Sequence, residues 1–239
     1  MNLNEFLNMA GFSRHRMIYK EKVISTLGGF LGIFAILIIS YQLLDPDIAV
    51  LIVPSMGASA VLLFAAPHLP FSQPWNLIGG HLISAVIGVL CWKLIPNYTL
   101  AAAASVGLAI GAMYFTRCIH PPGGATALAA IIGAEKIHNL GFTYILEPIL
   151  LNTVVIFLVA IAFNSLFKWR QYPAYLPFRK KDVSSKPKEP EPINHEDFVY
   201  ALSQMDTFMD VTEEDLLKIY KLATNRHTDK NTSTNKEHS

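Results

Sequence analysis

The feature that most constrains this sequence is the placement of its charged residues. The chain has 19 basic and 18 acidic residues, but only seven of them lie in the 145 residues from Val23 to Phe167. A segment of this length with so little charge, in a chain that is 52% hydrophobic, is typical of an integral membrane protein. The sequence therefore predicts that the middle of the chain is embedded in a lipid bilayer. The seven charged residues are Asp45, Asp47, Lys93, Arg117, Glu135, Lys136 and Glu147.

The apolar stretches have two different lengths. A helix needs about 20 apolar residues to cross a hydrocarbon core of about 30 Å, and four stretches meet this length, at about residues 23–44, 75–95, 99–117 and 147–168. Two further stretches, 48–66 and 120–134, contain or open on proline. Proline ends or kinks a helix, and the helix of about 13 residues that follows would be only about 20 Å long. These two stretches are predicted to be broken or re-entrant half-helices.

The two half-helices also resemble each other. VPSMGASAVLLFAA, from Val53, aligns without a gap with HPPGGATALAAIIG, from His120. Residues 23–95 and 99–167 can thus be read as two copies of a span, half-helix, span unit, which is typical of transporters; a chance alignment of small residues is the alternative. The predicted fold is an all-α, polytopic membrane bundle, with four crossings if the half-helices turn back and six if they cross.

The ends of the chain indicate its orientation and domains. Basic residues precede the first span and follow the last, which is the positive-inside pattern and places both termini in the cytoplasm. We expect a cytoplasmic segment at residues 1–22, a transmembrane domain at 23–168, a Pro-rich linker at 169–193, and a helical hairpin with a polar end at 194–239. The predicted location is the inner membrane of a bacterium, with the first span kept as an anchor.

Composition also limits the partners. Nothing in the sequence suggests nucleic acid as a partner, because no basic helix is interleaved with aromatic residues. Cys91 and Cys118 lie in apolar segments, where a free thiol behaves as a small hydrophobic group, and we expect both to be reduced. The expected partners are the lipid bilayer and a small inorganic anion, without a cofactor or a structural metal. The oligomeric state is left open.

The most specific motif is TRCIHPPGGATAL, which begins at Thr116. A helix that begins inside the membrane presents unpaired N–H groups and the positive end of its dipole, and an anion can satisfy both. The glycines allow backbone to approach a ligand closely. This motif is therefore predicted to bind an anion. The candidate residues are Arg117, His120, Pro121, Pro122, Gly123, Gly124 and Thr126.

The first half-helix offers a matching set, and a nearby span adds a histidine. Ser55, Gly57 and Ser59 occupy positions similar to those of the second motif. His81 is an ionisable residue within a span, which marks a functional candidate by default, although it could instead form a structural hydrogen bond to another helix. Arg117 has a similar alternative as an interfacial anchor. Small residues before and after His81 are interpreted as helix-packing positions.

Three segments carry a resemblance to a known family. PSMGASAVLLF from Pro54, QPWNLIGGHLISAVIG from Gln73 and HPPGGATAL from His120 are similar, in the same order, to blocks of the HPP family of integral membrane proteins. The resemblance covers about residues 20–180. It implies a four-helix membrane region, and the plastid and cyanobacterial members imply nitrite transport.

These observations lead to one main hypothesis and two alternatives. We expect a transporter or channel for a small monovalent anion, with nitrite implied by the resemblance, and not an enzyme. One alternative is a membrane sensor that acts through the hairpin tail. The other is a membrane enzyme that uses His81, His120 and His138; it is weaker because these histidines lack a metal-binding spacing and an acidic neighbour.

The tail yields a first testable prediction. Truncation after Lys181 should leave a folded, membrane-inserted protein with unchanged transport, because the removed segment contains no apolar span. Membrane insertion and monodispersity in detergent are the measurements. Loss of the protein from the membrane fraction would instead favour an assembly or sensory role for the tail.

Overall fold

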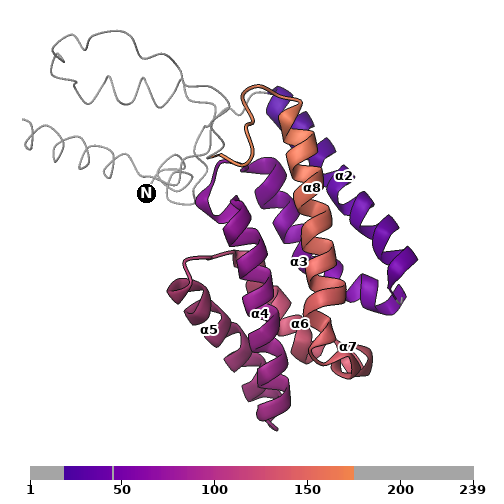
Figure 1. Ribbon diagram of the computed structural model, residues 1–239, viewed down its shortest axis with the longest axis vertical. Coiled ribbons are helices and arrows are strands. Elements are labelled where there is room, and N and C mark those ends of the chain that lie inside the picture. The colour runs from indigo at the N-terminus through magenta and orange to yellow at the C-terminus, as the bar shows by residue number, and fades with distance from the viewer. Residues whose placement is uncertain (1–18, 45, 175–239) are drawn as a thin grey trace, which may run out of the picture. The chain divides into compact units, whose positions relative to one another are not determined.

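The computed structural model describes residues 19–44 and 46–174, all of which belong to one compact helical unit (Figure 1). The described residues contain helices and no strand. The short elements are the 3₁₀ helix η1 (Pro70–Ser72) and the π-helix η2 (Ile145–Leu150). The α-helices are α2 (Tyr19–Leu43), α3 (Pro46–Ala65), α4 (Pro74–Leu94), α5 (Tyr98–Phe115), α6 (Pro121–Ile132), α7 (Ala134–Leu140) and α8 (Leu151–Ser165).

Four helices of the described part are long and apolar enough to cross a membrane: α2, α4, α5 and the continuous segment Ile145–Ser165, which joins η2 to α8. They correspond to the four predicted spans, so the prediction of an all-α polytopic membrane protein is confirmed. The predicted hairpin at 194–239, like most of the linker before it, lies outside the described residues.

The proline-containing segments differ from each other. Helix α6 begins at Pro121 and is only 12 residues long, as expected of a half-helix. Helix α3, in contrast, runs continuously through Pro54, where we expected a break. Membrane helices tolerate an interior proline because neighbouring groups can satisfy the freed backbone carbonyl. The expected free N-terminus at Pro54 is therefore absent, and α3 is a 20-residue helix.

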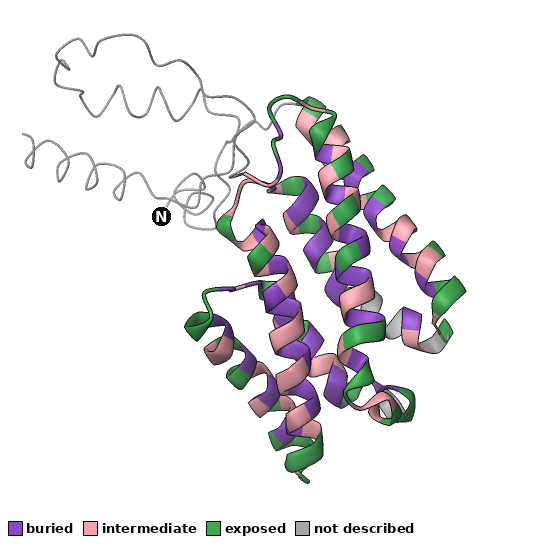
Figure 2. Cartoon of the chain, viewed as in Figure 1, coloured by how far each residue is buried: buried purple, intermediate pink, exposed green. Residues whose placement is uncertain are grey.

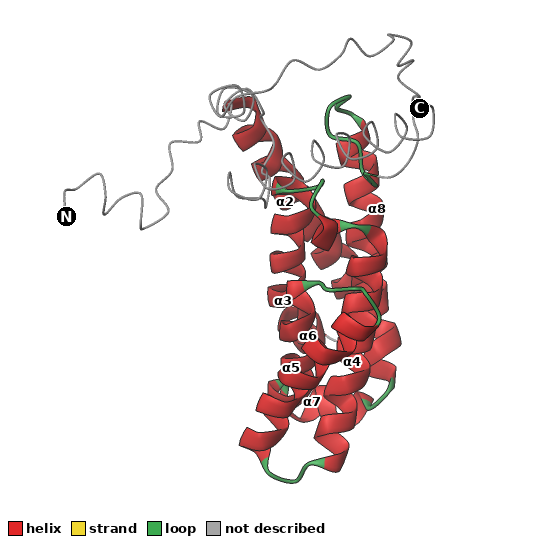
Figure 3. Cartoon of the chain, turned by 90° about the vertical axis from the view of Figure 1, so that its left-hand side faces the viewer, coloured by secondary structure: helices red, strands yellow, loops and turns green. Residues whose placement is uncertain are grey.

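Six of the seven α-helices in the described part pack in two groups of three. Helices α2, α3 and α8 contact one another, and so do α4, α5 and α6, while α3 and α6 join the groups (Figures 1 and 3). Helix α4, the third helix of the first predicted repeat, thus packs with α5 and α6 of the second. Helix α8 of the second packs in the same way with α2 and α3 of the first. The third helix of each predicted repeat thus packs with the other repeat. This arrangement is compatible with a duplicated unit, and the duplication itself stays a prediction.

Polar contacts hold together one end of the bundle. The buried guanidinium of Arg170 donates to the Phe64 carbonyl in the last turn of α3, to Asn164 of α8, and to the Glu21 carboxylate at the start of α2. A cation at the C-terminus of a helix is favoured by the helix dipole. The Tyr172 hydroxyl donates to the Ser72 carbonyl, just before α4. The start of α2, the end of α3, the start of α4 and the end of α8 therefore share this end.

The pattern of burial distinguishes a bundle interior of small and polar residues from an apolar outer surface. Large apolar side chains are exposed along α2, α5 and α8, whereas the small and polar residues of α4 and α6 are mostly buried (Figure 2). In water such a surface would be unstable, but hydrocarbon favours it. Exposed examples are Phe30, Phe34, Leu108, Phe115 and Leu158.

Glycines allow α4 and α6 to pack closely. A Cβ on Gly80 would lie 2.4 Å from the His120 Cβ, and one on Gly88 would lie 2.6 Å from the Ala127 carbonyl oxygen. On α6, a Cβ on Gly123 would lie 2.7 Å from Ser84 Oγ. Small residues at such crossings are the usual device for helix packing in lipid. The interpretation of the small residues around His81 as packing positions is confirmed.

Two adjacent glycines of α6 give a matched stability test. A methyl group at Gly123 would clash with Ser84 and with the Gly80 carbonyl, whereas one at Gly124 would meet only Val106 Cγ1, at 3.8 Å. Gly123→Ala should therefore destabilise the protein by about 1–3 kcal/mol, while Gly124→Ala should be neutral or stabilise it by up to about 1 kcal/mol through helix propensity. The melting temperature of each variant in detergent, monitored by size-exclusion chromatography after heating, measures both changes in stability. Equal melting temperatures for the two variants would contradict this packing.

Candidate functional site

Two histidines meet in the interior of the bundle. His81 lies in the second turn of α4, and His120 is the N-cap residue of α6. Both side chains are fully buried, and their ring centroids are 4.8 Å apart in an edge-to-face arrangement. The two sequence candidates are thus direct neighbours. The approach is possible because Gly80 leaves room for His120.

A serine of a third helix bridges the two rings. The hydroxyl oxygen of Ser59, on α3, lies 2.8 Å from His81 Nε2 and 2.9 Å from His120 Nε2. Ser59 is itself fully buried. Helices α3, α4 and α6 therefore each contribute one side chain to a single hydrogen-bonded cluster, and burial makes each of these bonds costly to break.

The outer ring nitrogens also have partners. His81 Nδ1 lies 2.7 Å from the Thr126 hydroxyl on α6, and His120 Nδ1 lies 2.9 Å from the Phe71 carbonyl oxygen in η1. The result is a continuous chain of contacts from Thr126 through His81, Ser59 and His120 to Phe71. We call these five residues the histidine network.

The network has one consistent hydrogen assignment when both rings are neutral. The Phe71 carbonyl only accepts, so His120 carries its proton on Nδ1 and its Nε2 accepts from Ser59. Ser59 has one proton to give, so it must accept from His81 Nε2–H. His81 Nδ1 is then bare and accepts from Thr126. Every side-chain N–H and O–H bond of the histidine network thus points toward Phe71.

Two backbone carbonyls offer the hydroxyls a second acceptor. Ser59 Oγ lies 3.2 Å from the Ser55 carbonyl oxygen, and Thr126 Oγ1 lies 3.4 Å from that of Pro122. Both are longer than the contacts within the network, but each hydroxyl can rotate toward them. Two titratable side chains of the described residues lie near the network: Tyr144, whose hydroxyl donates to the Thr126 carbonyl, and Cys118, which lies next to Gly79.

The network lies close to one end of the bundle. Ser59 is six residues before the end of α3 and His81 is seven residues after the start of α4, which corresponds to about 9–11 Å along each helix axis. Phe71 lies in the short connection between these helices, beside the exposed Pro70. The Phe71 end of the network therefore faces the shared end of the bundle, and Thr126 lies deeper.

The N-terminus of α6 offers an anion fewer donors than the sequence predicted. Of the first three positions, Pro121 and Pro122 have no N–H, and the N–H of Gly123 donates to the His120 carbonyl at 2.8 Å. Gly123 is also covered by α4. The candidate functional groups at this helix start are therefore the polar side chains of the histidine network rather than free backbone N–H groups.

The other predicted site residues are spread over different surfaces. Ser55 lies one turn before Ser59 on the same buried face of α3. Arg117 is exposed, with a left-handed backbone (φ 55°), in the loop before α6. Gly124 faces Val106 of α5. The structure thus brings His81, His120, Ser59 and Thr126 together, and it leaves Arg117 and Gly124 outside this cluster.

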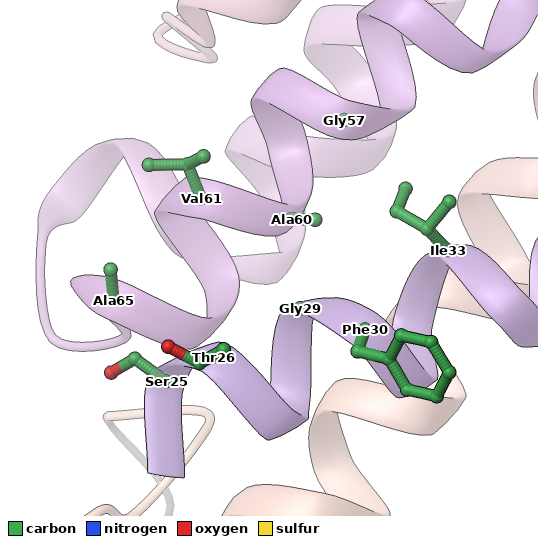
Figure 4. Close-up of a pocket in the computed structure, with 9 residues that line it drawn as sticks. All are labelled: Ser25, Thr26, Gly29, Phe30, Ile33, Gly57, Ala60, Val61 and Ala65. Carbon is green, nitrogen blue, oxygen red and sulfur yellow. The ribbon is translucent and has the colours of Figure 1, made fainter. Parts of the chain in front are cut away.

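Gly57 also lies away from the network. It lines an open groove between α2 and α3, with a volume of about 380 Å³ (Figure 4). Helix geometry explains this placement, because residues two apart on a helix, such as Gly57 and Ser59, point to nearly opposite sides. The residues lining the groove are Ser25, Thr26, Gly29, Phe30, Ile33, Gly57, Ala60, Val61 and Ala65.

Some polar groups were not predicted as site residues. The Phe71 carbonyl is a backbone atom, and Tyr144 resembles any other tyrosine in an apolar segment. The sequence therefore gives no reason to select either group. Asn152 accepts from Ser40 at 2.6 Å and so joins α8 to α2. Its Nδ2, together with Thr153 Oγ1, is a buried side-chain atom without a partner in the described part of the chain.

The structure also places the two cysteines and the side chains that could bind a metal. Cys91 and Cys118 are free and buried, as expected. Within residues 19–44 and 46–174, no three His, Cys, Asp or Glu side chains are grouped closely enough to hold a metal ion. The two rings of the network direct their Nε2 atoms at a serine hydroxyl and not at a common metal position.

These features define a class: a polytopic helical membrane protein with a buried, hydrogen-bonded histidine pair at the start of a short inner helix. A family model described as the HPP transmembrane region matches residues 14–173, and the chain belongs to this family. The His120, Pro121 and Pro122 motif that carried the resemblance is thus at the centre of the site. The implied family is confirmed.

Two transmembrane proteins of Dictyostelium discoideum are similar to this chain. One is 42% identical over 154 residues, covering 62% of this chain and 53% of the relative. The other is 38% identical over 156 residues, covering 63% of this chain and 50% of the relative. The chain thus spans about half the length of the curated relatives that it matches. No solved structure matches it.

The hydrogen assignment gives a prediction for the resting protein. His120 should carry its proton on Nδ1 and His81 on Nε2, because the Phe71 carbonyl fixes the direction of the whole chain. Solid-state ¹⁵N NMR of histidine-labelled protein in lipid distinguishes the two tautomers, with His81→Gln and His120→Gln used to assign the signals. A His120 ring protonated on Nε2 alone would contradict the assignment.

Proposed function

We propose that this protein is a transporter of a small monovalent anion, with nitrite as the candidate that the family resemblance implies. The observation that carries the proposal is the histidine network, buried at the point where α3, α4 and α6 meet. Burying ionisable side chains in a membrane bundle is expensive, and such residues usually mark a substrate or ion pathway. Membership of the HPP family supports a membrane function, and the substrate is part of the proposal.

An anion suits this site for electrostatic reasons. A protonated imidazole carries a positive charge and has N–H donors, both of which favour a monovalent anion. The three helices of the network contain one acidic residue, Asp47, at the second position of α3. Cation sites usually require carboxylates or many carbonyl ligands, so this environment favours an anion over a metal cation.

The arrangement favours a transport site over a nucleophilic enzyme. A serine beside a histidine is also the beginning of a catalytic pair. Here, however, Ser59 is shared between two rings, and those rings are oriented by the Thr126 hydroxyl and the Phe71 carbonyl, not by a carboxylate. We therefore propose a carrier without an enzymatic role.

Uptake of nitrite and of chloride into liposomes containing the purified protein tests the proposal. Thr126→Val keeps the side-chain shape but removes one hydroxyl, so anion affinity should fall by about 0.5–1.5 kcal/mol, or roughly two- to tenfold. Thr126→Ser restores a hydroxyl and should recover most of the affinity.

Ser105→Ala is the matched control for this test. It removes a buried hydroxyl of α5 that donates only to the nearby Ala102 carbonyl, so uptake should stay at the wild-type level. Folding of each variant is checked by size-exclusion chromatography. Wild-type vesicles that take up neither anion would contradict the proposed function.

A further inference from the structure

We propose that the histidine network carries one extra proton, which it takes up and returns at its Thr126 end, and that the anion crosses the membrane together with this proton. The proton transfer itself does not depend on the proposed function, whereas the coupling to an anion does. The basis is geometric: each of the four contacts in the chain is between 2.7 and 2.9 Å, and donors and acceptors alternate along it.

The resting network can accept a proton at Thr126, its deeper end. An acid at Thr126, either hydronium or the conjugate acid of the anion, gives a proton to Thr126 Oγ1 while the original Thr126 proton passes to His81 Nδ1. The Nε2 proton of His81 then moves to Ser59, and the original Ser59 proton moves to His120 Nε2. His120 then carries a proton on both ring nitrogens, and its Nδ1–H still donates to the Phe71 carbonyl. One proton enters and is held on His120, and each bond to hydrogen that breaks is replaced by an O–H or N–H bond that forms.

After this transfer the contacts between His120 and Thr126 point in the opposite direction. His120 Nε2–H now donates to Ser59, Ser59 to His81 Nε2, and His81 Nδ1–H to Thr126, whose hydroxyl turns to the Pro122 carbonyl at 3.4 Å. The same steps in reverse return the extra proton from His120 to Thr126, where the anion accepts it and leaves as its conjugate acid. The network thus takes up one proton and returns one in each cycle, and it ends in the resting hydrogen arrangement.

Coupling follows from the cost of charge in a low-dielectric interior. An anion alone in the bundle would have no compensating charge and would be strongly disfavoured. When one ring holds the extra proton, the anion beside it forms a neutral pair. Anion and proton should therefore cross in equal number, and the flux should not depend on the membrane potential.

The experiment measures proton and anion entry in the same vesicles. Full-length protein is reconstituted into liposomes that contain a pH-sensitive dye, and valinomycin with set potassium gradients fixes the membrane potential. Nitrite is added outside, its uptake is measured chemically, and protein-free vesicles correct for nitrous acid that crosses lipid unaided. Wild type should take up about one proton per nitrite, at a rate that does not change with potential.

Variants test whether the network carries the proton. His120→Gln keeps a hydrogen-bonding side chain that cannot hold an extra proton, and Ser59→Ala separates the two rings. Each should reduce proton uptake by about tenfold or more, and any nitrite flux that remains should depend on potential. Ser84→Ala, a buried serine of α4 that contacts Met113 Sδ, is the control and should behave like wild type.

The outcomes separate the two proposals. Nitrite uptake that follows the potential without internal acidification overturns the proton transfer and leaves the anion transporter standing. Proton entry without nitrite uptake supports the transfer and overturns the anion transporter. An unchanged proton-to-nitrite ratio in folded His120→Gln and Ser59→Ala overturns the network as the route. If either variant fails to fold, the wild-type ratio and its dependence on potential still decide.

Discussion

The constraint on which the rest of the structure depends is that a polar group inside a bilayer must find its partner within the protein. His81, His120 and Ser59 satisfy one another, and the Phe71 carbonyl and Thr126 complete the chain. This requires α3, α4 and α6 to meet at one point. The same constraint operates at the end of the bundle, where buried Arg170 donates to the Phe64 carbonyl in the last turn of α3.

Close packing and hydrogen bonding depend on each other here. Gly80 has no side chain, so His120 can lie against α4 within reach of Ser59. Gly123 lies against Ser84 and the Gly80 carbonyl in the same way. The adjacent prolines begin α6 without adding N–H groups that would need partners. The HPP motif with its two glycines therefore shapes the site mainly through geometry, while the histidines supply the chemistry.

The sequence predicts the parts of this account that depend on local pattern. The spans follow from apolar length, the start of α6 follows from Pro121 and Pro122, and His81 is selected because ionisable residues are rare in spans. The meeting of Ser59 with His120 is a tertiary contact between residues 61 positions apart, which local pattern does not reveal. The expected break at Pro54 would have put Ser55 and Gly57 in the first turn of a helix, whereas in the continuous helix α3 both lie in the helix interior. Neighbouring helices, not local propensity, decide whether an interior proline breaks a membrane helix.

The central claim is that the histidine network binds a proton together with the anion. Calorimetric titration of purified protein with nitrite at neutral pH, in buffers of different ionisation enthalpy, counts the protons taken up on binding. The account predicts a binding heat that varies with the buffer and corresponds to about one proton per bound anion, with both rings neutral beforehand. A binding heat that is identical in all buffers would show that the anion binds without a proton and would contradict the account.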